Sequence, residues 1–114
     1  MSGSDLTFTV SRHTDRAVVT IAGDLDAVGA PAIIAEIDRA AADTSLLGTV
    51  LDLRDCDFVD STGLSVFITG VKRGREANRG FDLVVASPRV LRVLEVTGLD
   101  VIIPIHATLD GALA

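Results

Sequence analysis

The sequence of 114 residues contains one cysteine, two histidines and no tryptophan or tyrosine. A single cysteine, Cys56, cannot form an internal disulfide, so the expected environment is a reducing cytoplasm. His13 and His106 have no second histidine or cysteine at a metal-ligand spacing, and we expect neither a metal nor another cofactor. The only aromatic residues are four phenylalanines. The core must therefore be built from Val, Leu, Ile and Ala, which suits a sheet covered by helices.

Basic residues are also scarce, because 10 Lys and Arg stand against 16 Asp and Glu and give a net charge of -6. Such a protein has little positive surface for a phosphate backbone or an anionic membrane, so we expect neither nucleic acid nor membrane as a partner. No apolar run approaches the ~20 residues of a spanning helix. Residues 1–5 lack the basic and apolar regions of a secretory signal. We expect one cytoplasmic domain over residues 1–114.

Strand-like and helix-like segments alternate along the chain. Residues 6–11 and 17–22 predict a hairpin, 31–42 a helix with Pro31 in its first turn, and 48–53 a buried strand. A second helix begins at Asp60-Ser61-Thr62, where three good N-cap side chains precede an apolar stripe. Residues 81–86 predict another strand, Ser87-Pro88 starts a helix that Gly98 ends, and 101–105 predict a last strand. This order favours one mixed sheet covered mainly by helices.

Two polar segments follow strands and are expected at the carboxyl edge of the sheet, where open α/β folds place their sites. One is Gly-Asp-Leu-Asp at 23–26, and the other is Asp-Ser-Thr-Gly-Leu at 60–64. On spacing alone, the second segment is a helix cap in which Gly63 allows close backbone approach. Ser61 as a catalytic nucleophile is disfavoured, because it lacks a glycine-flanked elbow and a histidine placed by any motif.

Positive charge is concentrated in one run, at Lys72, Arg73, Arg75 and Arg79. The glycines around these residues do not follow the order of a phosphate-binding loop. Cations near a helix C-terminus are favourable by themselves, and this is the simpler interpretation. A contact with a partner remains the alternative.

The segments Leu-Asp-Leu at 51–53 and Phe-Val-Asp-Ser-Thr-Gly-Leu at 58–64 resemble the signature of STAS domains, specifically of bacterial anti-sigma factor antagonists. The resemblance covers roughly Leu6 to His106, because the 23–26 loop, the Ser87-Pro88 helix and the Thr97-Gly98-Leu99 ending look like the other landmarks of the family. It implies a small STAS-like α/β fold, with a mixed, mostly parallel sheet of about five strands and helices mainly on one face.

The resemblance also implies a function in the regulation of transcription by partner switching, without enzymatic activity. In that family the serine after the aspartate is phosphorylated by an anti-sigma factor that is also a serine kinase, which assigns Ser61 as the phosphorylation site. The unphosphorylated protein would bind the anti-sigma factor and release a sigma factor, and a phosphatase is a further candidate partner. The residues implied in partner binding are Asp24, Asp26, Asp60, Thr62, Gly63 and Leu64.

The chain departs from the family pattern at two places. Ser65 replaces the usual glycine after the leucine, and the terminal helix, starting near Thr108, looks too short to dock. Three other functions stay open: a permanent STAS subunit of a stress-signalling scaffold or lipid-transport assembly, a nucleotide-binding module, and the cytoplasmic domain of a sulphate transporter.

Overall fold

The computed structural model describes residues 6–114, and residues 1–5, considered above for a secretory signal, lie outside this described part. It contains one five-stranded sheet in the order β1-β2-β3-β4-β5. β1 pairs antiparallel with β2, and the later pairs are parallel, so the predicted mixed sheet is confirmed. The strands are β1 (Thr7–His13), β2 (Arg16–Ala22), β3 (Gly48–Asp55), β4 (Gly80–Val85) and β5 (Ile105–His106).

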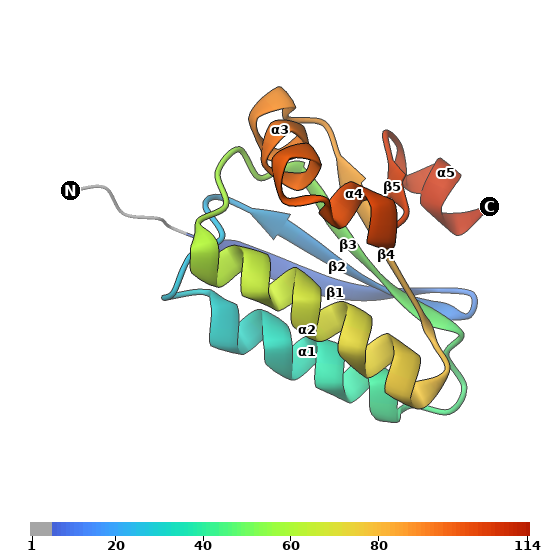
Figure 1. Cartoon of the computed structure of the whole chain (residues 1–114). Coiled ribbons are helices and arrows are strands. Elements are labelled where there is room, and N and C mark those ends of the chain that lie inside the picture. Colours follow the sequence, from blue (N-terminus) through green and yellow to red (C-terminus); the bar gives the residue numbers. More distant parts are fainter. Residues whose placement is uncertain (1–5) are drawn as a thin grey trace.

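Helices cover mainly one face of this sheet (Figure 1). α1 (Ala30–Ala42) and α2 (Ser61–Ala77) run side by side across it, and α3 (Pro88–Thr97) and the short α4 (Leu99–Ile102) complete the layer. The main core lies between this layer and the strands, and includes Val19, Leu51 and Leu83.

The short C-terminal helix α5 (Leu109–Leu113) covers part of the other face. Strand side chains alternate between the two faces of the sheet, so Val18 and Val19 lie on opposite faces. A separate buried cluster joins Val18, Val50 and Val84 to Ala112 of α5. Arg16 Nη1 also donates to the carbonyl oxygen of Ala112, over 3.1 Å. The expectation that this helix is too short to dock was therefore wrong, since Ala112 is buried against the sheet and Leu109 and Leu113 pack beside it.

The last strand, predicted over residues 101–105, forms later in the chain, at Ile105–His106, and lies at the edge of the sheet. Gly98 ends α3 with φ of 78°, and the chain at once makes another helical turn, α4, in which Ile103 N donates to the oxygen of Leu99. Only Ile105 and His106 pair with β4. A short apolar run does not distinguish a strand from a helical turn by periodicity, and here the left-handed glycine restarts the helix.

The glycine-containing run at residues 70–75, which resembles a phosphate-binding loop only in composition, is helical. It lies inside α2, which ends at Asn78 in a left-handed conformation, with φ of 57°. A Cβ atom on Gly70 would lie 2.2 Å from Cζ of Phe81, so only glycine lets α2 approach that ring. The glycine therefore serves packing between helix and sheet rather than phosphate binding.

Candidate functional site

The two polar loops predicted at the carboxyl edge of the sheet lie side by side, joined by backbone hydrogen bonds around Leu25. Leu25 N donates to Phe58 O over 2.9 Å, and Asp60 N donates to Leu25 O over 3.2 Å. Gly23 N donates to the oxygen of Asp55 over 3.1 Å, which anchors the start of the first loop. The loop at 23–26 thus lies directly beside the turn that leads into α2, as the sequence predicted.

Ser61 is the first residue of α2, and its backbone position is closely determined. Asp60 is the N-cap, with its side chain accepting a hydrogen bond from Gly63 N over 2.9 Å. A Cβ on Gly63 would lie 2.4 Å from Leu25 O and 2.7 Å from Cγ1 of Val59. Gly63 therefore allows the close backbone approach that the sequence suggested, and Ser61 itself is exposed.

The other residues predicted to bind a partner are less accessible than Ser61. Gly63 is buried, while Thr62 and Leu64 are half-buried, and Leu64 packs against the core. Asp24 and Asp26 are also half-buried. Oδ1 of Asp26 accepts hydrogen bonds from the backbone of Val28 and Gly29, at 3.1 and 3.4 Å, so this carboxylate orders the turn before α1.

Ser65, the residue that departs from the family pattern, is exposed one turn into α2. Its hydroxyl donates to the carbonyl oxygen of Thr62 over 2.6 Å. This bond directs the polar atom back onto the helix, so Ser65 presents mainly extra volume to a partner.

Three features of this surface were missed by the sequence analysis. Val28 and Phe58 are apolar side chains beside the two loops, and they are 84% and 44% exposed. Asp57 connects the turn before α2 to α3, because it accepts hydrogen bonds from Ser87 Oγ at 2.7 Å and from Arg89 at 3.3 Å. Of these residues, only Ser87 could be recognised from the sequence, as a helix cap. The exposure of Val28 and Phe58 and the contact of Asp57 with Ser87, 30 residues away, depend on tertiary structure.

Two buried groups near the site have shifted pKa values. Burial raises the pKa of the Cys56 thiol, which is 1% exposed and donates to the oxygen of Phe58, so it is a packed and unreactive group. Burial also acts to raise the pKa of Asp52, but hydrogen bonds from Arg54 outweigh it and hold that pKa below 3.8. Oδ2 of Asp52 accepts from Arg54 Nη2 over 2.7 Å. Asp52 and Cys56 therefore stabilise the end of β3 and the turn after it, and neither takes part in chemistry at Ser61.

The histidines lie away from Ser61. His106 Nε2 is 2.8 Å from Oδ2 of Asp82 on β4, and His13 lies at the far end of β1, 3.1 Å from Ser11 Oγ. Neither is placed to act as a base for Ser61. Within residues 6–114, no group of three His, Cys, Asp or Glu side chains could hold a metal ion, and no helix is long and apolar enough to cross a membrane.

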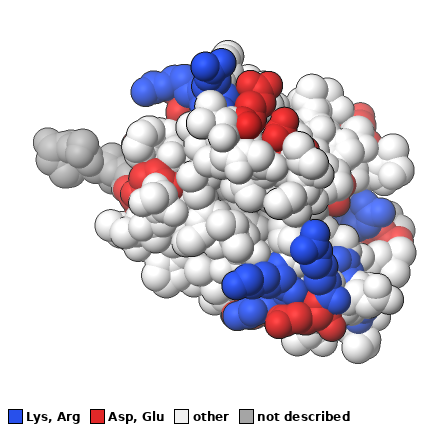
Figure 2. Space-filling model, viewed as in Figure 1, with Lys and Arg blue, Asp and Glu red and all other residues white. Residues whose placement is uncertain are grey.

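Charge differs between the two ends of α2. Asp24, Asp26 and Asp60 surround its N-terminus, whereas Lys72 and Arg75 lie in its last turns. Figure 2 shows Lys and Arg atoms gathered over the C-terminal ends of α1 and α2, at the lower right. The surface around Ser61 is therefore acidic, and the opposite end carries much of the positive charge of the molecule.

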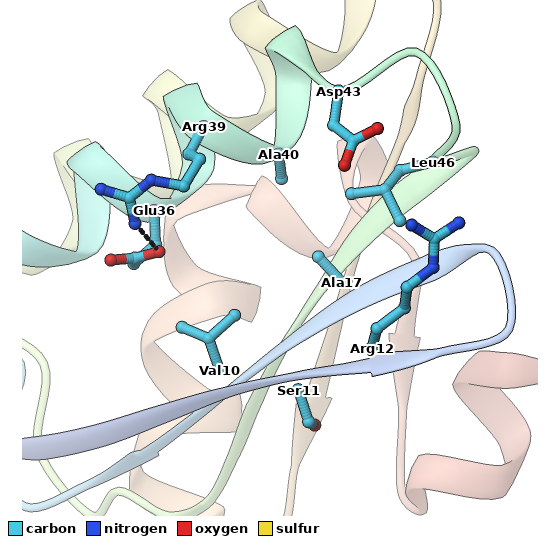
Figure 3. Close-up of a pocket in the computed structure, with 9 residues that line it drawn as sticks. All are labelled: Val10, Ser11, Arg12, Ala17, Glu36, Arg39, Ala40, Asp43 and Leu46. Atoms are coloured by element: carbon cyan, nitrogen blue, oxygen red, sulfur yellow. Dashed lines mark hydrogen bonds and ion pairs between the residues drawn. The ribbon is translucent and has the colours of Figure 1, made fainter.

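A hollow of about 300 Å³ lies between β1 and the C-terminal half of α1, away from Ser61 (Figure 3). Its floor is formed by Val10, Ala17, Ala40 and Leu46. A smaller hollow, of about 160 Å³, lies between Phe58 and α3. Ser61 is exposed and lines neither hollow, so its surroundings suit a protein surface better than a small substrate.

An exposed serine at the start of α2, with a Gly-Asp-Leu-Asp loop held beside it, is the arrangement expected from the resemblance. The STAS domain family matches residues 8–112. The chain belongs to the STAS domain family.

Relatives of this STAS domain have names that agree on one activity. It is 33% identical over 94 residues to the anti-sigma-B factor antagonist of Listeria monocytogenes, with 82% of each chain covered. It is 32% identical over 115 residues to the anti-sigma-F factor antagonist RsfB of Mycobacterium tuberculosis, with 99% of this chain and 92% of that protein covered. The crystal structure of an anti-sigma factor antagonist from Mycobacterium paratuberculosis superposes with a TM-score of 0.86 at 34% identity, covering 98% of this chain and 94% of that one.

Proposed function

We propose that this STAS domain is an anti-sigma factor antagonist that acts by binding rather than by catalysis. In its unphosphorylated form it binds an anti-sigma factor over Ser61 and releases the sigma factor. Phosphorylation of Ser61 by that anti-sigma factor, acting as a serine kinase, reverses the binding. The observation that carries the proposal is the exposed Ser61 at the first position of α2, beside the loop at 23–26. The names of relatives at 30 to 33% identity support it.

The geometry gives a physical reason for a switch. A phosphate adds about -1.5 to -2 charge, and the N-terminus of a helix tolerates it. The same charge would lie among Asp24, Asp26 and Asp60 and next to the exposed Val28 and Phe58. A partner that packs on these apolar side chains would have to bury the phosphate, which is costly without a paired cation. Phosphorylation should therefore release the partner without unfolding the domain.

The test is phosphopeptide mapping after incubation with ATP and each candidate anti-sigma kinase from the same genome. Wild type, Ser61→Ala and Thr62→Ala should be compared, because Thr62 offers a neighbouring hydroxyl as a matched control. We expect phosphate on Ser61 in wild type and in Thr62→Ala and none in Ser61→Ala. Tight binding of the kinase by Ser61→Asp, or phosphate on no residue with any kinase, would contradict the switch and favour a permanent interaction subunit.

A further inference from the structure

A groove of about 230 Å³ lies between α2, β4 and the α4 segment, at the opposite end of α2 from Ser61. Its apolar lining comes from Val71, Phe81, Ile102 and Pro104, and two guanidinium side chains, Arg75 and Arg79, also line it. The groove therefore combines an apolar surface with concentrated positive charge, in a chain whose net charge is -6.

The return of the chain after α2 brings the two arginines together. Asn78 turns the backbone in a left-handed conformation, and Arg79 N then donates to Gly74 O over 2.7 Å. The side chain of Arg79 is held by a bond from its Nη1 to the oxygen of Ala77 over 2.8 Å. Arg79 thus lies against the last turns of α2, where Arg75 is exposed.

Neither arginine makes an ion pair with a carboxylate in the part of the chain that the structure describes. Moreover, Nε of Arg79 is buried and has no hydrogen-bond partner among residues 6–114. Asp82 lines the groove too, but its side chain alternates with that of Phe81 and pairs with His106 at 2.8 Å. By contrast, Arg73 of the same helix pairs with Asp38 at 2.7 Å. The two guanidinium groups of the groove thus make no ion pair within residues 6–114, and Arg79 interacts with the charge of Asp43 only at longer range.

The groove continues the surface that begins at Ser61. Ser61, Leu64, Ile68, Val71 and Arg75 follow one another at intervals of three and four residues, so they share one face of α2. Arg75 lies about 21 Å along the helix from Ser61, at ~1.5 Å per residue. Ile68 is 44% exposed, and across the groove Ile102 is 50% and Val101 86% exposed. A single partner surface can reach both ends of this stripe.

We propose that this groove binds an acidic side chain, carried on an apolar segment of the protein partner that covers Ser61. The partner carboxylate lies at the mouth of the groove, where the positive charges of Arg75 and Arg79 attract it. The neighbouring apolar side chains of the partner pack on Val71, Ile102 and Val101. The proposal rests on the proposed function and adds the chemistry of the partner. A partner that is basic where it meets Asp24 and Asp60, and acidic at this groove, can dock in only one orientation along α2.

The larger hollow beside β1 serves as an internal control. Arg39 lines it, but this side chain already forms an ion pair with Glu36 (Figure 3). Arg12, which also lines it, donates to Ser45. Arg39 does not line the groove beside Arg79. Arg39→Glu therefore changes the net charge as much as Arg75→Glu does, but leaves that groove intact. A binding effect of net charge alone would appear equally in Arg39→Glu and Arg75→Glu.

The first test is the affinity of unphosphorylated wild type, Arg75→Glu and Arg39→Glu for the anti-sigma factor, with thermal unfolding to confirm that each variant is folded. We expect Arg75→Glu to weaken binding at least about tenfold, the loss of one close charge pair, and Arg39→Glu to bind within about twofold of wild type. Equal affinities for wild type and Arg75→Glu would overturn the proposal. If wild type binds no anti-sigma factor, the proposed function fails instead.

The second test needs no protein partner and therefore separates the two failures. Hexanoate supplies a carboxylate on an apolar chain, and hexanol is its uncharged counterpart. In an NMR titration of the full chain, we expect hexanoate to shift the Nε–Hε signal of Arg79 and the methyl signals of Val71 and Ile102 saturably. Hexanol, and hexanoate with Arg75→Glu, should leave these signals unchanged. Signals that do not saturate with hexanoate, or that respond equally to hexanol, would overturn the carboxylate site even if the anti-sigma factor binds.

Discussion

The two ends of α2 are built in opposite ways. At the N-terminus, Asp60 caps the helix, Gly63 packs against Leu25, and the surrounding charges are acidic. At the C-terminus, Asn78 reverses the chain in a left-handed turn and the surrounding charges are basic. Both charge patterns complement the helix dipole. Close contacts hold both ends, because a Cβ on Gly74 would lie 2.8 Å from Arg79 O. The difference lies in charge pairing, since Arg75 and Arg79 make no ion pair within residues 6–114, whereas the Asp60 carboxylate accepts the capping hydrogen bond from Gly63 N.

The largest expected effect comes from Gly63→Ala. The added methyl group would meet backbone oxygen and a valine side chain, and overpacking of this kind lowers the free energy of unfolding by about 1 to 3 kcal/mol. Gly80→Ala is the matched change beyond the other end of α2, where the nearest atoms to a Cβ lie 3.7 Å away. Urea unfolding followed by circular dichroism should show a loss for Gly63→Ala only. Equal midpoints for the two variants would show that the close contacts of Gly63 do not constrain the start of α2.

The next effect concerns the two caps. Asp60→Ala removes the acceptor for Gly63 N and should reduce the free energy of unfolding by about 1 kcal/mol, whereas Asp60→Asn keeps a capping oxygen and most of the stability. At the other end, Asn78→Gly should change stability by only a few tenths of a kcal/mol, because glycine adopts the left-handed conformation readily. Thermal unfolding compares the three variants. A loss in Asp60→Asn as large as in Asp60→Ala would assign the effect to charge instead of capping.

Asp52 of β3, which lies at neither end of α2, serves as a reference for the pH dependence of stability. The folded-state pKa of Asp52 lies below its ordinary value of 3.8, so its stabilising effect is present above pH 3.8 and is lost as the pH falls through the lower, folded-state pKa. Asp52→Asn should therefore reduce stability at pH 7, by about 1 kcal/mol, and bring variant and wild type together in acid. Urea unfolding at a series of pH values measures this. A difference that stays constant on acidification would show that packing, not ionisation, causes the loss.

The smallest effect is expected from the paired cation of α2. Arg73 and Asp38 form an exposed ion pair, with side chains 41% and 48% exposed, so Arg73→Ala should change the free energy of unfolding only slightly. A double-mutant cycle with Asp38→Ala measures the coupling energy between Arg73 and Asp38. This coupling energy should fall in 1 M salt, where charges are screened. Insensitivity to salt would point to packing of the arginine stem on α1.

Much of this architecture could be predicted because local signals and tertiary packing agree. Pro31, Ser87 and Gly98 mark helix ends that the structure confirms, and the two loops meet because both follow parallel strands. The predictions misplaced the last strand and missed the docking of α5, where the outcome depends on the left-handed conformation of Gly98 and on the packing of Ala112, Leu109 and Leu113. The exposed Val28, the Asp57 contact with α3 and the groove beside Arg79 bring together distant segments and left no local pattern to detect.

The backbone bonds around Leu25 also bear on how such a surface can diverge. The link between the two loops uses main-chain atoms, from Leu25 to Phe58 and from Asp60 to Leu25. Substitutions at exposed neighbours such as Val28 or Ser65 therefore leave this link in place. Duplicated copies of the gene can acquire different binding preferences through such changes while keeping the same serine in the same position, and parallel signalling systems in one cell can stay insulated from each other.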